Sequence, residues 1–278
     1  MAIIIDGKEV ARKTRENLKN KVAELKKQNI FPKLAVIMVG EDPASKIYVR
    51  NKSKACEELG IEYEEFLLKE DITQQELIKL INELNSREDV HGILLQSPIP
   101  QHLDINEAFR TIAPEKDVDG FNPVNVGKLV LGQETFISCT PFGVIKMLEE
   151  YNIEIEGKNA VVIGRSNIVG KPMLQCLLNK HATVTICHSK TKNLKELTKK
   201  ADILVAAIGK PKFVTEDMVK PGAVVIDVGI NRDENGKVCG DVDFENVKNI
   251  AGYITPVPGG VGPMTIAMLM TNIVKAAK

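Results

Sequence analysis

The stretch Val161-Val162-Ile163-Gly164-Arg165-Ser166-Asn167-Ile168-Val169-Gly170 decides the fold. Its short apolar run predicts a strand, and the turn bounded by Gly164 and Gly170 leads into a segment typical of a helix. In such units the glycines let the backbone approach a pyrophosphate, which binds free N–H groups at the helix N-terminus. The glycine spacing alone is weak evidence, because many glycine turns bind nothing. The surrounding sequence strengthens the interpretation as a dinucleotide site.

Apolar runs separated by helical segments continue on both sides of this turn. Five of them predict strands, at residues 160–164, 183–187, 203–209, 223–229 and 251–256. This alternation is typical of a parallel sheet covered by helices on both faces. We therefore predict a Rossmann-type α/β domain in the second part of the chain.

The residues after the second predicted strand indicate which dinucleotide binds. Folds of this type usually carry Asp or Glu there to hold the ribose hydroxyls, but this chain has His188-Ser189-Lys190. A carboxylate would repel a 2′-phosphate, whereas Ser189 and Lys190 can donate hydrogen bonds to it. Arg165 and Ser166 in the glycine turn also suit an additional phosphate. The sequence favours NADP over NAD, unless Ser189 and Lys190 merely begin a solvated loop.

Length and composition are those of an ordinary enzyme. With 278 residues, two domains are expected, and 37 basic against 37 acidic residues give no general attraction to nucleic acid or to an anionic membrane. Because no apolar run approaches the roughly 20 residues that cross a bilayer, we expect a cytoplasmic location. The five cysteines are odd in number and form no Cys-x-x-Cys pair, and the four histidines show no metal-ligand spacing. Neither disulfides nor a metal site are predicted.

A separate alternation precedes residue 140. It predicts helices at 7–28, 43–59 and 74–84 and strands at 34–39, 62–68 and 92–96. The segment 114–142 is rich in turn formers, so we place the domain boundary there, between a catalytic domain at 1–139 and the dinucleotide domain at 140–262. A last helix at 263–278 has Pro263 in its first turn, and we expect it to pack back on the first domain.

The helix that opens at Asp42-Pro43 carries candidate catalytic residues. With Tyr48 set at zero and a rotation of about 100° per residue, Lys52 lies near +40° and Ser45 near +60°. Both therefore fall inside an apolar stripe that also holds Ala55, Cys56 and Leu59. A lysine there either extends to the surface along its methylenes or occupies a pocket, where desolvation lowers its pKa and makes it usable as a base. Tyr48, one turn earlier, favours the second alternative, because the pair suggests a cleft for a flat substrate.

Two further segments indicate the same cleft. The run 90–98 predicts a buried strand that ends at Gln96, where α/β folds bind ligands, so Gln96 is a candidate positioning residue. Lys116-Asp117-Val118-Asp119-Gly120-Phe121 places two carboxylates in a turn-rich segment. Such a pattern is more often a turn, although a carboxylate can hold the N–H edge of a heterocycle. The further ligands that a calcium loop needs are absent.

Six motifs, in order and over essentially the whole chain, resemble the bifunctional methylenetetrahydrofolate dehydrogenase/methenyltetrahydrofolate cyclohydrolase family. The motifs are Tyr48-Val49-Arg50-Asn51-Lys52-Ser53-Lys54-Ala55, the segment 92–98, Pro114-Glu115-Lys116-Asp117-Val118-Asp119-Gly120-Phe121, Cys139-Thr140-Pro141, the segment 164–170 and Pro256-Val257-Pro258-Gly259-Gly260-Val261-Gly262-Pro263-Met264-Thr265. One departure is Ser97, where the family more often has leucine after the glutamine. Ser97 lines the suspected cleft, so this departure bears on substrate packing there, while the amide of Gln96 and the proline Pro98 are retained.

The resemblance implies NADP-dependent oxidation of 5,10-methylenetetrahydrofolate to 5,10-methenyltetrahydrofolate, followed by hydrolysis to 10-formyltetrahydrofolate, in a cleft between the two domains. It also implies that Tyr48 stacks on the folate ring system and that Lys52 activates water or moves protons. Gln96 would hold the lysine, and Ser45 would support its hydrogen bonds. Asp119 would accept hydrogen bonds from the N–H groups of the pterin, in a folate-binding domain at 1–139.

For the cofactor, the resemblance implies that Gly164, Arg165 and Ser166 take the phosphates. Ser189 would take the 2′-phosphate, and the backbone at Ile230 would hold the nicotinamide end. It further implies a homodimer whose interface comes from the NADP domain, with tetrahydrofolate derivatives as substrates and no nucleic-acid or membrane partner.

Two alternatives remain open at this point. A shikimate-type dehydrogenase would share the two-domain plan, but would pair its lysine with an aspartate rather than with Tyr48 and Gln96. A non-catalytic NADP-sensing module would keep Arg165 and Ser189, but would not need a lysine inside an apolar stripe. Formation of NADPH from methylenetetrahydrofolate separates the three.

Overall fold

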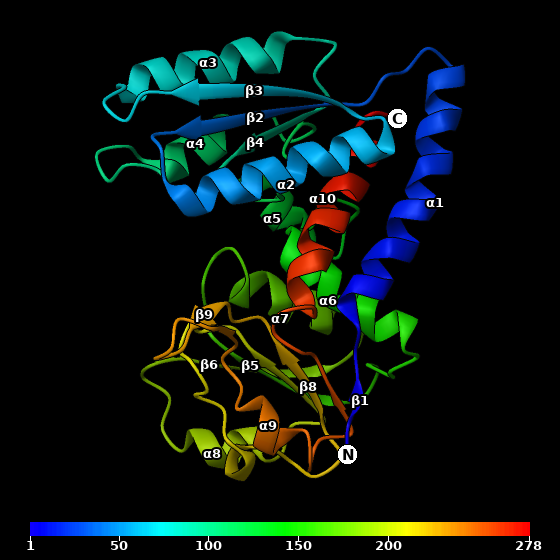
Figure 1. The fold of residues 1–278 in the computed structure, drawn as a ribbon, viewed down its shortest axis with the longest axis vertical. Coiled ribbons are helices and arrows are strands. Elements are labelled where there is room, and N and C mark those ends of the chain that lie inside the picture. The colour runs from blue at the N-terminus through cyan, green and yellow to red at the C-terminus, as the bar shows by residue number, and fades with distance from the viewer. The chain divides into compact units, whose positions relative to one another are not determined.

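The computed structural model describes residues 1–278, apart from the side chain of Ala44, and divides into two compact units (Figure 1). We call them the six-stranded unit, which comprises Met1–Arg12 and Cys139–Thr265, and the three-stranded unit, which comprises Lys13–Ser138 and Ile266–Lys278. Each unit has its own sheet and its own buried core, and each is described by itself below.

The six-stranded unit contains a fully parallel sheet. Its strands lie in the order β1 (Ile3–Ile4), β11 (Tyr253–Ile254), β8 (Val224–Asp227), β7 (Ile203–Ala206), β5 (Asn159–Ile163) and β6 (Thr183–Cys187). From β5 the chain moves outward to β6 and then returns to β7 on the other side of β5. The direction of winding therefore reverses between β5 and β7, which is where doubly wound sheets bind ligands.

Helices cover both faces of this sheet. Figure 1 shows α6 (Cys139–Glu150) and α7 (Gly170–Leu178) on one side, and α8 (Leu194–Thr198) and α9 (Phe244–Val247) on the other. The central strands are apolar runs with both faces buried, as parallel sheets require. Leu204 of β7 and Val225 of β8 belong to the same buried core. Burial of each such side chain stabilises the fold by about 1.5–3 kcal/mol.

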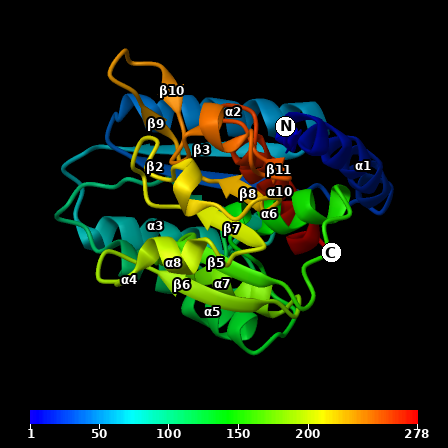
Figure 2. The same ribbon diagram turned by 90° about the horizontal axis from the view of Figure 1, so that it is seen from below.

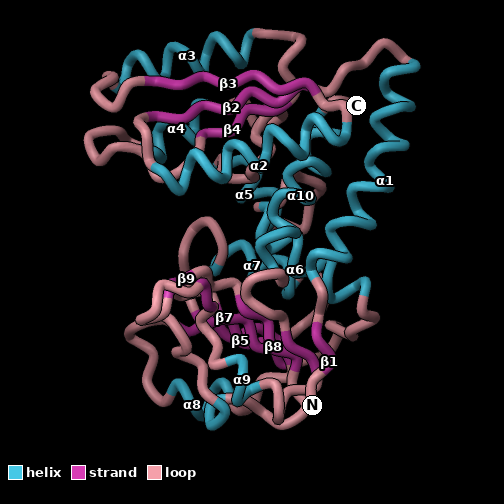
Figure 3. The backbone as a smooth tube through the Cα atoms, in the orientation of Figure 1, coloured by secondary structure: helices cyan, strands magenta, loops and turns pink.

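The three-stranded unit contains a smaller parallel sheet. Its order is β3 (Glu62–Leu68), β2 (Lys33–Val39) and β4 (Gly92–Leu95). The tube in Figure 3 shows α3 (Gln74–Ser86) and α2 (Pro43–Leu59) on opposite sides of these strands. The unit also holds α4 (Ile105–Thr111) and α5 (Pro123–Val130), while α1 (Gly7–Lys27) and α10 (Val261–Ala276) have residues in both units.

Local signals fix the ends of α2. Asp42 accepts a hydrogen bond of 2.7 Å from Ser45 N, and Pro43 occupies the first turn, where no N–H partner is needed. The helix ends at Gly60, which adopts a left-handed conformation with φ of 70° and donates to the carbonyls of Cys56 and Glu57. These caps fix where the helix begins and ends, and the burial of Val49, Cys56 and Leu59 sets the face that it turns inward.

The fold class expected from the sequence is confirmed, since the chain forms two α/β units with parallel sheets. The strands and helices expected at 43–59, 62–68 and 183–187 have those bounds in the structure. The segment 114–142, which lacks clear periodicity, contains α5 and the start of α6. Elements that the sequence did not predict include strand β1, helices α4 and α5, and the hairpin of β9 (Asn231–Arg232) and β10 (Val238–Cys239) seen in Figure 2.

The last helix contributes to the three-stranded unit through residues 266–278. Asn272 Nδ2 donates 2.8 Å to Val118 O, and Lys275 Nζ donates 2.9 Å to Thr135 O. Met270 lies against Cys56, with 3.7 Å between the sulfur atoms. The helix therefore fastens the segment that carries the two aspartates of the Lys116–Gly120 motif.

Candidate active site

Lys52 and Gln96 meet in the three-stranded unit. Lys52 Nζ donates a hydrogen bond of 2.9 Å to Gln96 Oε1, although the residues lie on α2 and just after β4. Gln96 is only 8% exposed, and its own amide donates 2.6 Å to Ser97 O. The lysine is half-buried. The structure thus brings together two side chains that the sequence singled out separately.

The buried face of α2 is centred beside Lys52 rather than on Tyr48. Ser45 and Cys56 are almost completely buried, whereas 43% of Tyr48 is exposed. Tyr48 therefore lies at the rim of the buried stripe, with its ring accessible. An exposed aromatic ring one turn before the lysine is available to stack on a flat substrate.

Ser45 presents a buried hydroxyl close in sequence to these residues. It is 2% exposed, and its Oγ has no hydrogen-bond partner among the described residues. Leaving a buried polar atom unpaired costs about 1–3 kcal/mol, so such atoms commonly receive a partner from water or a ligand. The hydroxyl can therefore pair with a molecule bound beside α2.

Cys56 lies on the same helix face as Lys52 but is not an alternative catalytic group. Burial raises the pKa of its thiol to about 12, although the positive charge of Lys52 acts in the opposite direction. The thiol stays protonated at neutral pH and offers neither a base nor a nucleophile.

The two carboxylates of the Lys116–Gly120 motif have different environments. Asp117 is buried and accepts hydrogen bonds from Phe121 N at 3.1 Å, Asn122 N at 2.8 Å and Asn125 Nδ2 at 2.8 Å. Burial raises its pKa against the effect of these bonds. Asp119 is half-buried. The first aspartate therefore shapes the turn, and the second is the more exposed of the two.

Lys116 supports this turn in a way that the sequence did not reveal. Its Nζ donates to three carbonyls at the C-terminal end of α3, those of Leu84 at 3.2 Å, Asn85 at 2.8 Å and Arg87 at 2.6 Å. The negative end of the helix dipole favours a cation there. The lysine ties the motif to α3.

In the six-stranded unit, the glycine turn has the backbone geometry of a close-approach site. Gly164 has φ of 119°, and a Cβ there would lie 2.1 Å from Ala207 O. A Cβ at Gly170 would lie 2.2 Å from Gly164 O. Side chains are excluded at both positions, so the turn can pack tightly between β5 and α7.

The remaining cofactor candidates are exposed around this turn. Arg165, Ser166 and Ser189 are exposed, and Ile230 is 57% exposed. Ser166 Oγ accepts from Val169 N at 3.2 Å and Gly170 N at 3.3 Å, which caps the start of α7. In both bonds the hydroxyl oxygen is the acceptor, so neither bond involves the O–H group of Ser166 as a donor.

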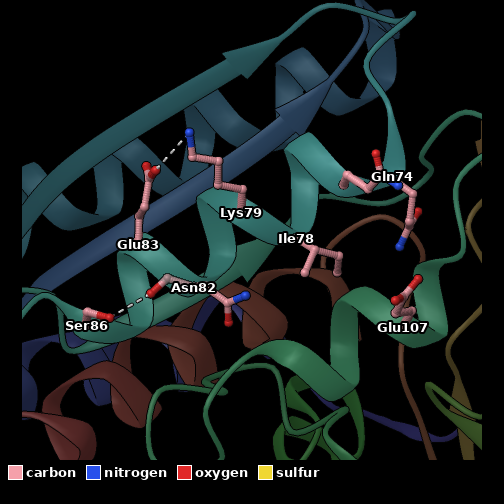
Figure 4. Close-up of a pocket in the computed structure, with 8 residues that line it drawn as sticks. Gln74, Ile78, Lys79, Asn82, Glu83, Ser86 and Glu107 are labelled. Carbon is pink, nitrogen blue, oxygen red and sulfur yellow. Dashed lines mark hydrogen bonds and ion pairs between the residues drawn. The ribbon is translucent and has the colours of Figure 1, made fainter.

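Other surface features do not overlap these residues. A pocket of about 560 Å³ lies between α3 and α4. Figure 4 shows side chains that line it, among them Gln74, Ile78, Asn82 and Glu107. None of the predicted site residues lines it. Over the described part of the chain, the structure has no cluster of three metal-ligating side chains and no helix long and apolar enough to span a membrane.

The winding of the six-stranded sheet and its glycine turn define a dinucleotide-binding α/β protein. Residues 138–278 match the tetrahydrofolate dehydrogenase/cyclohydrolase NAD(P)-binding domain, and residues 5–119 match the catalytic domain of the same family. The chain belongs to the tetrahydrofolate dehydrogenase/cyclohydrolase family, as the six motifs predicted. This excludes the shikimate-type alternative.

Relatives resemble the chain over its whole length. The bifunctional protein FolD of Bacillus mycoides is 58% identical over 278 residues, covering 100% of this chain and 97% of that protein. The crystal structure of the FolD dehydrogenase/cyclohydrolase of Campylobacter jejuni has a TM-score of 0.98 at 54% identity, covering 100% and 99% of the two chains. The Trypanosoma brucei FolD structure, complexed with NADP cofactor and inhibitor, has a TM-score of 0.94 at 38% identity and covers 99% and 97%.

Proposed function

We propose that this enzyme oxidises 5,10-methylenetetrahydrofolate to 5,10-methenyltetrahydrofolate with NADP and then hydrolyses the product to 10-formyltetrahydrofolate. The observation that carries the proposal is the hydrogen bond of 2.9 Å between Lys52 and Gln96 in a chain of this family. A non-catalytic NADP sensor would not need a half-buried lysine held by a buried amide.

Hydrolysis of the methenyl cation requires proton transfers, and Lys52 is the group that performs them. Water adds to the carbon between the two folate nitrogens and loses one proton, which leaves a hydroxyl on that carbon. One C–N bond then breaks as its nitrogen gains a proton, and the hydroxyl loses its proton to form the formyl C=O, so one proton is released overall. Gln96 fixes the lysine nitrogen, and the buried Ser45 hydroxyl is a partner for water or for the lysine. Positioned proton transfer of this kind contributes about 10²–10⁴ in rate.

Hydride transfer depends mainly on positioning, because two nitrogens stabilise the cation that it forms. Tyr48 stacks on the flat folate ring system with its exposed ring. Asp119 accepts hydrogen bonds from the amino and ring N–H groups of the pterin, while Asp117 holds the turn. The substrate is thus held at its ring face and at its N–H edge.

The six-stranded unit binds NADP at the glycine turn. Gly164 leaves room for the phosphates, Arg165 supplies a guanidinium, and the O–H of Ser166 donates to a phosphate oxygen. Ser189 donates to the 2′-phosphate, and the backbone at Ile230 contacts the nicotinamide end. Such sites place phosphates at the N-terminus of the following helix, which here is α7.

We further propose that the enzyme is a cytoplasmic homodimer whose interface comes from the six-stranded unit. Support comes from β6, which pairs only with β5 and forms an edge of the sheet. An edge strand presents unpaired N–H and C=O groups that a second copy can cover.

The decisive experiment supplies purified protein with 5,10-methylenetetrahydrofolate and NADP and follows NADPH by absorbance. We expect NADPH to form and 10-formyltetrahydrofolate to accumulate afterwards. Absence of NADPH formation with NADP bound would favour a sensor and contradict the proposal.

A further inference from the structure

The loops after β5, β7 and β8 share one edge of the six-stranded sheet. Ala207 N donates 2.8 Å to Ile163 O, and Val228 N donates 2.9 Å to Ala206 O, so the three strands end side by side. This is the carboxyl edge, where the sheet reverses its winding and where a dinucleotide is expected. Groups that shape the loop after β7 therefore shape the cofactor site.

One buried carboxylate holds the loop after β7. Asp241 is completely buried, and its Oδ2 accepts from Ile208 N at 2.7 Å and from Gly209 N at 3.1 Å. Its Oδ1 accepts from Lys210 N at 2.8 Å and from Asn231 Nδ2 at 2.8 Å. Four donors from two separate segments, the loop after β7 and the start of β9, converge on this side chain, and Asn231 directly follows the cofactor candidate Ile230.

A second buried carboxylate holds the first. Asp227, at the end of β8, is 3% exposed and accepts from Gly229 N at 3.0 Å, from Asp241 N at 2.9 Å and from Val242 N at 2.9 Å. The backbone of Asp241 is thereby fixed to the same strand end that leads to Ile230.

Two glycines make this close packing possible. A Cβ at Gly229 would lie 2.3 Å from Asp241 Oδ1, and a Cβ at Gly240 would lie 1.9 Å from Asp227 Oδ2. Each glycine therefore leaves room for the carboxylate of the other segment. The two segments interlock through a pair of glycines and a pair of aspartates.

We infer that Asp241 is a positioning residue of the cofactor site, which holds the loop 208–210 and Asn231 in the shape that receives NADP, and that Asp227 holds Asp241 in place. The inference rests on the proposed NADP site at the same sheet edge. Asp241 does not touch the cofactor, because its oxygens are occupied by protein donors. It acts by fixing the loop before the cofactor arrives, which reduces the ordering cost of binding.

The test is Asp241→Asn, which keeps the size of the side chain but replaces one accepting oxygen by a donor. We expect the KM for NADP to rise about tenfold, as loss of about 1.4 kcal/mol of binding would produce, with the KM for the folate unchanged. Hydrogen exchange at the amides of 208–210 should accelerate. The matched control is Asp233→Asn, whose carboxylate accepts from Asn235 N and Lys237 N in the β9–β10 turn; it should leave the KM for NADP unchanged.

If the Asp241 variant does not fold, Asn231→Ala is the second test, because this substitution removes only one of the four donors to Asp241. It should raise the KM for NADP in the same direction and by less. Faster exchange at 208–210 with unchanged NADP binding in both variants would overturn the inference and leave Asp241 a purely structural residue. If the proposed NADP site is itself wrong, Arg165→Ala should leave the affinity for NADP unchanged, and this result is independent of the Asp241 variants.

Discussion

Lys52 Nζ lies 2.9 Å from Gln96 Oε1, and this hydrogen bond connects α2 to the residue that follows β4. Gln96 is fixed at two further points, since its backbone N donates 2.8 Å to Ile37 O and its side chain donates 2.6 Å to Ser97 O. The acceptor is therefore rigid, and the position of the lysine nitrogen is determined by the sheet. A base that must meet a substrate at one place requires this kind of support.

Lys52→Met should abolish hydrolysis of the methenyl cation while leaving the fold and NADP binding intact. Methionine keeps most of the methylene packing and removes the nitrogen, so we expect a loss of about 10²–10⁴ in cyclohydrolase rate. Dehydrogenase activity should fall less, because hydride transfer depends on positioning. Lys54→Met, at an exposed position on the same helix, is the control and should retain both activities. A Lys52→Met enzyme that hydrates the cation at the unmodified rate would show the lysine to be a bystander.

Asp119→Asn should weaken folate binding and leave NADP affinity intact, because it removes charge and keeps shape. A hydrogen bond to a charged group contributes about 1.5–3 kcal/mol, so the dissociation constant should rise at least tenfold in calorimetry. Asp117→Asn is the comparison, since that carboxylate holds the turn through three donors and its loss should lower the melting temperature instead. Unchanged folate affinity in Asp119→Asn would reduce this residue to a turn former.

Most of the fold could be predicted because its signals are local. The caps of α2 and the uninterrupted apolar runs of β5, β7 and β8 mark their elements without knowledge of the rest of the chain. Strand β1 could not be predicted, since two residues carry no periodicity and its existence depends on pairing with β11, about 250 residues later. The expected strand 203–209 ends at Ala206, because the amides of Ile208 and Gly209 bond to the side chain of Asp241 and not to a neighbouring strand.

The candidate site was predictable where chemistry and helical geometry coincide. Lys52 and Ser45 fall on the buried face that the rotation along α2 indicates, and Gln96 ends its strand. The supporting residues were not predictable, because Lys116 and Asp241 act through backbone groups far away in sequence. A charge bonded to carbonyls or amides leaves no periodic signal in the chain.

Arg165→Ala should raise the KM for NADP far more than the KM for NAD. The guanidinium is expected to pair with the additional phosphate of NADP, which NAD lacks, and loss of such a contact costs about 1.5–3 kcal/mol, or roughly tenfold to more than a hundredfold in binding. Lys158→Ala is the control, because that side chain pairs with Glu154 and lies just before the amino end of β5, whereas the glycine turn follows the carboxyl end of the same strand. Equal use of NADP and NAD by the unmodified enzyme would contradict the preference assigned to Arg165 and Ser189.

Sedimentation at micromolar concentration should show a dimer rather than the 30.6 kDa chain alone. If β6 forms the interface, a charged substitution at its exposed position Thr185 should shift the enzyme toward the monomer. The matched substitution at Lys199, exposed on the same unit, should leave the dimer unchanged. A monomer in the unmodified protein contradicts the proposal, and a dimer unaffected by Thr185→Asp places the interface elsewhere.

Asp227 should make the stability of the enzyme depend on pH. Burial raises the pKa of this carboxyl to about 7, and the neighbouring charge of Asp241 acts in the same direction. In the unfolded chain an aspartate titrates near 3.9, so between about pH 4 and pH 7 the folded protein keeps a proton that the unfolded chain releases. The free energy of unfolding therefore falls as pH rises through this window, and the change is complete above the folded pKa.

Asp227→Asn removes this titration and keeps the size of the side chain. From pH 5 to pH 8 the unfolding free energy of the unmodified enzyme should fall by roughly 2 kcal/mol relative to the variant, as expected for a shift of about three pKa units. Urea unfolding of both proteins at each pH measures the difference. Asp233→Asn, in the exposed hairpin turn, should follow the unmodified enzyme. Parallel curves for the Asp227 variant and the unmodified enzyme would mean that Asp227 is ionised throughout this range, held in that state by its three N–H donors.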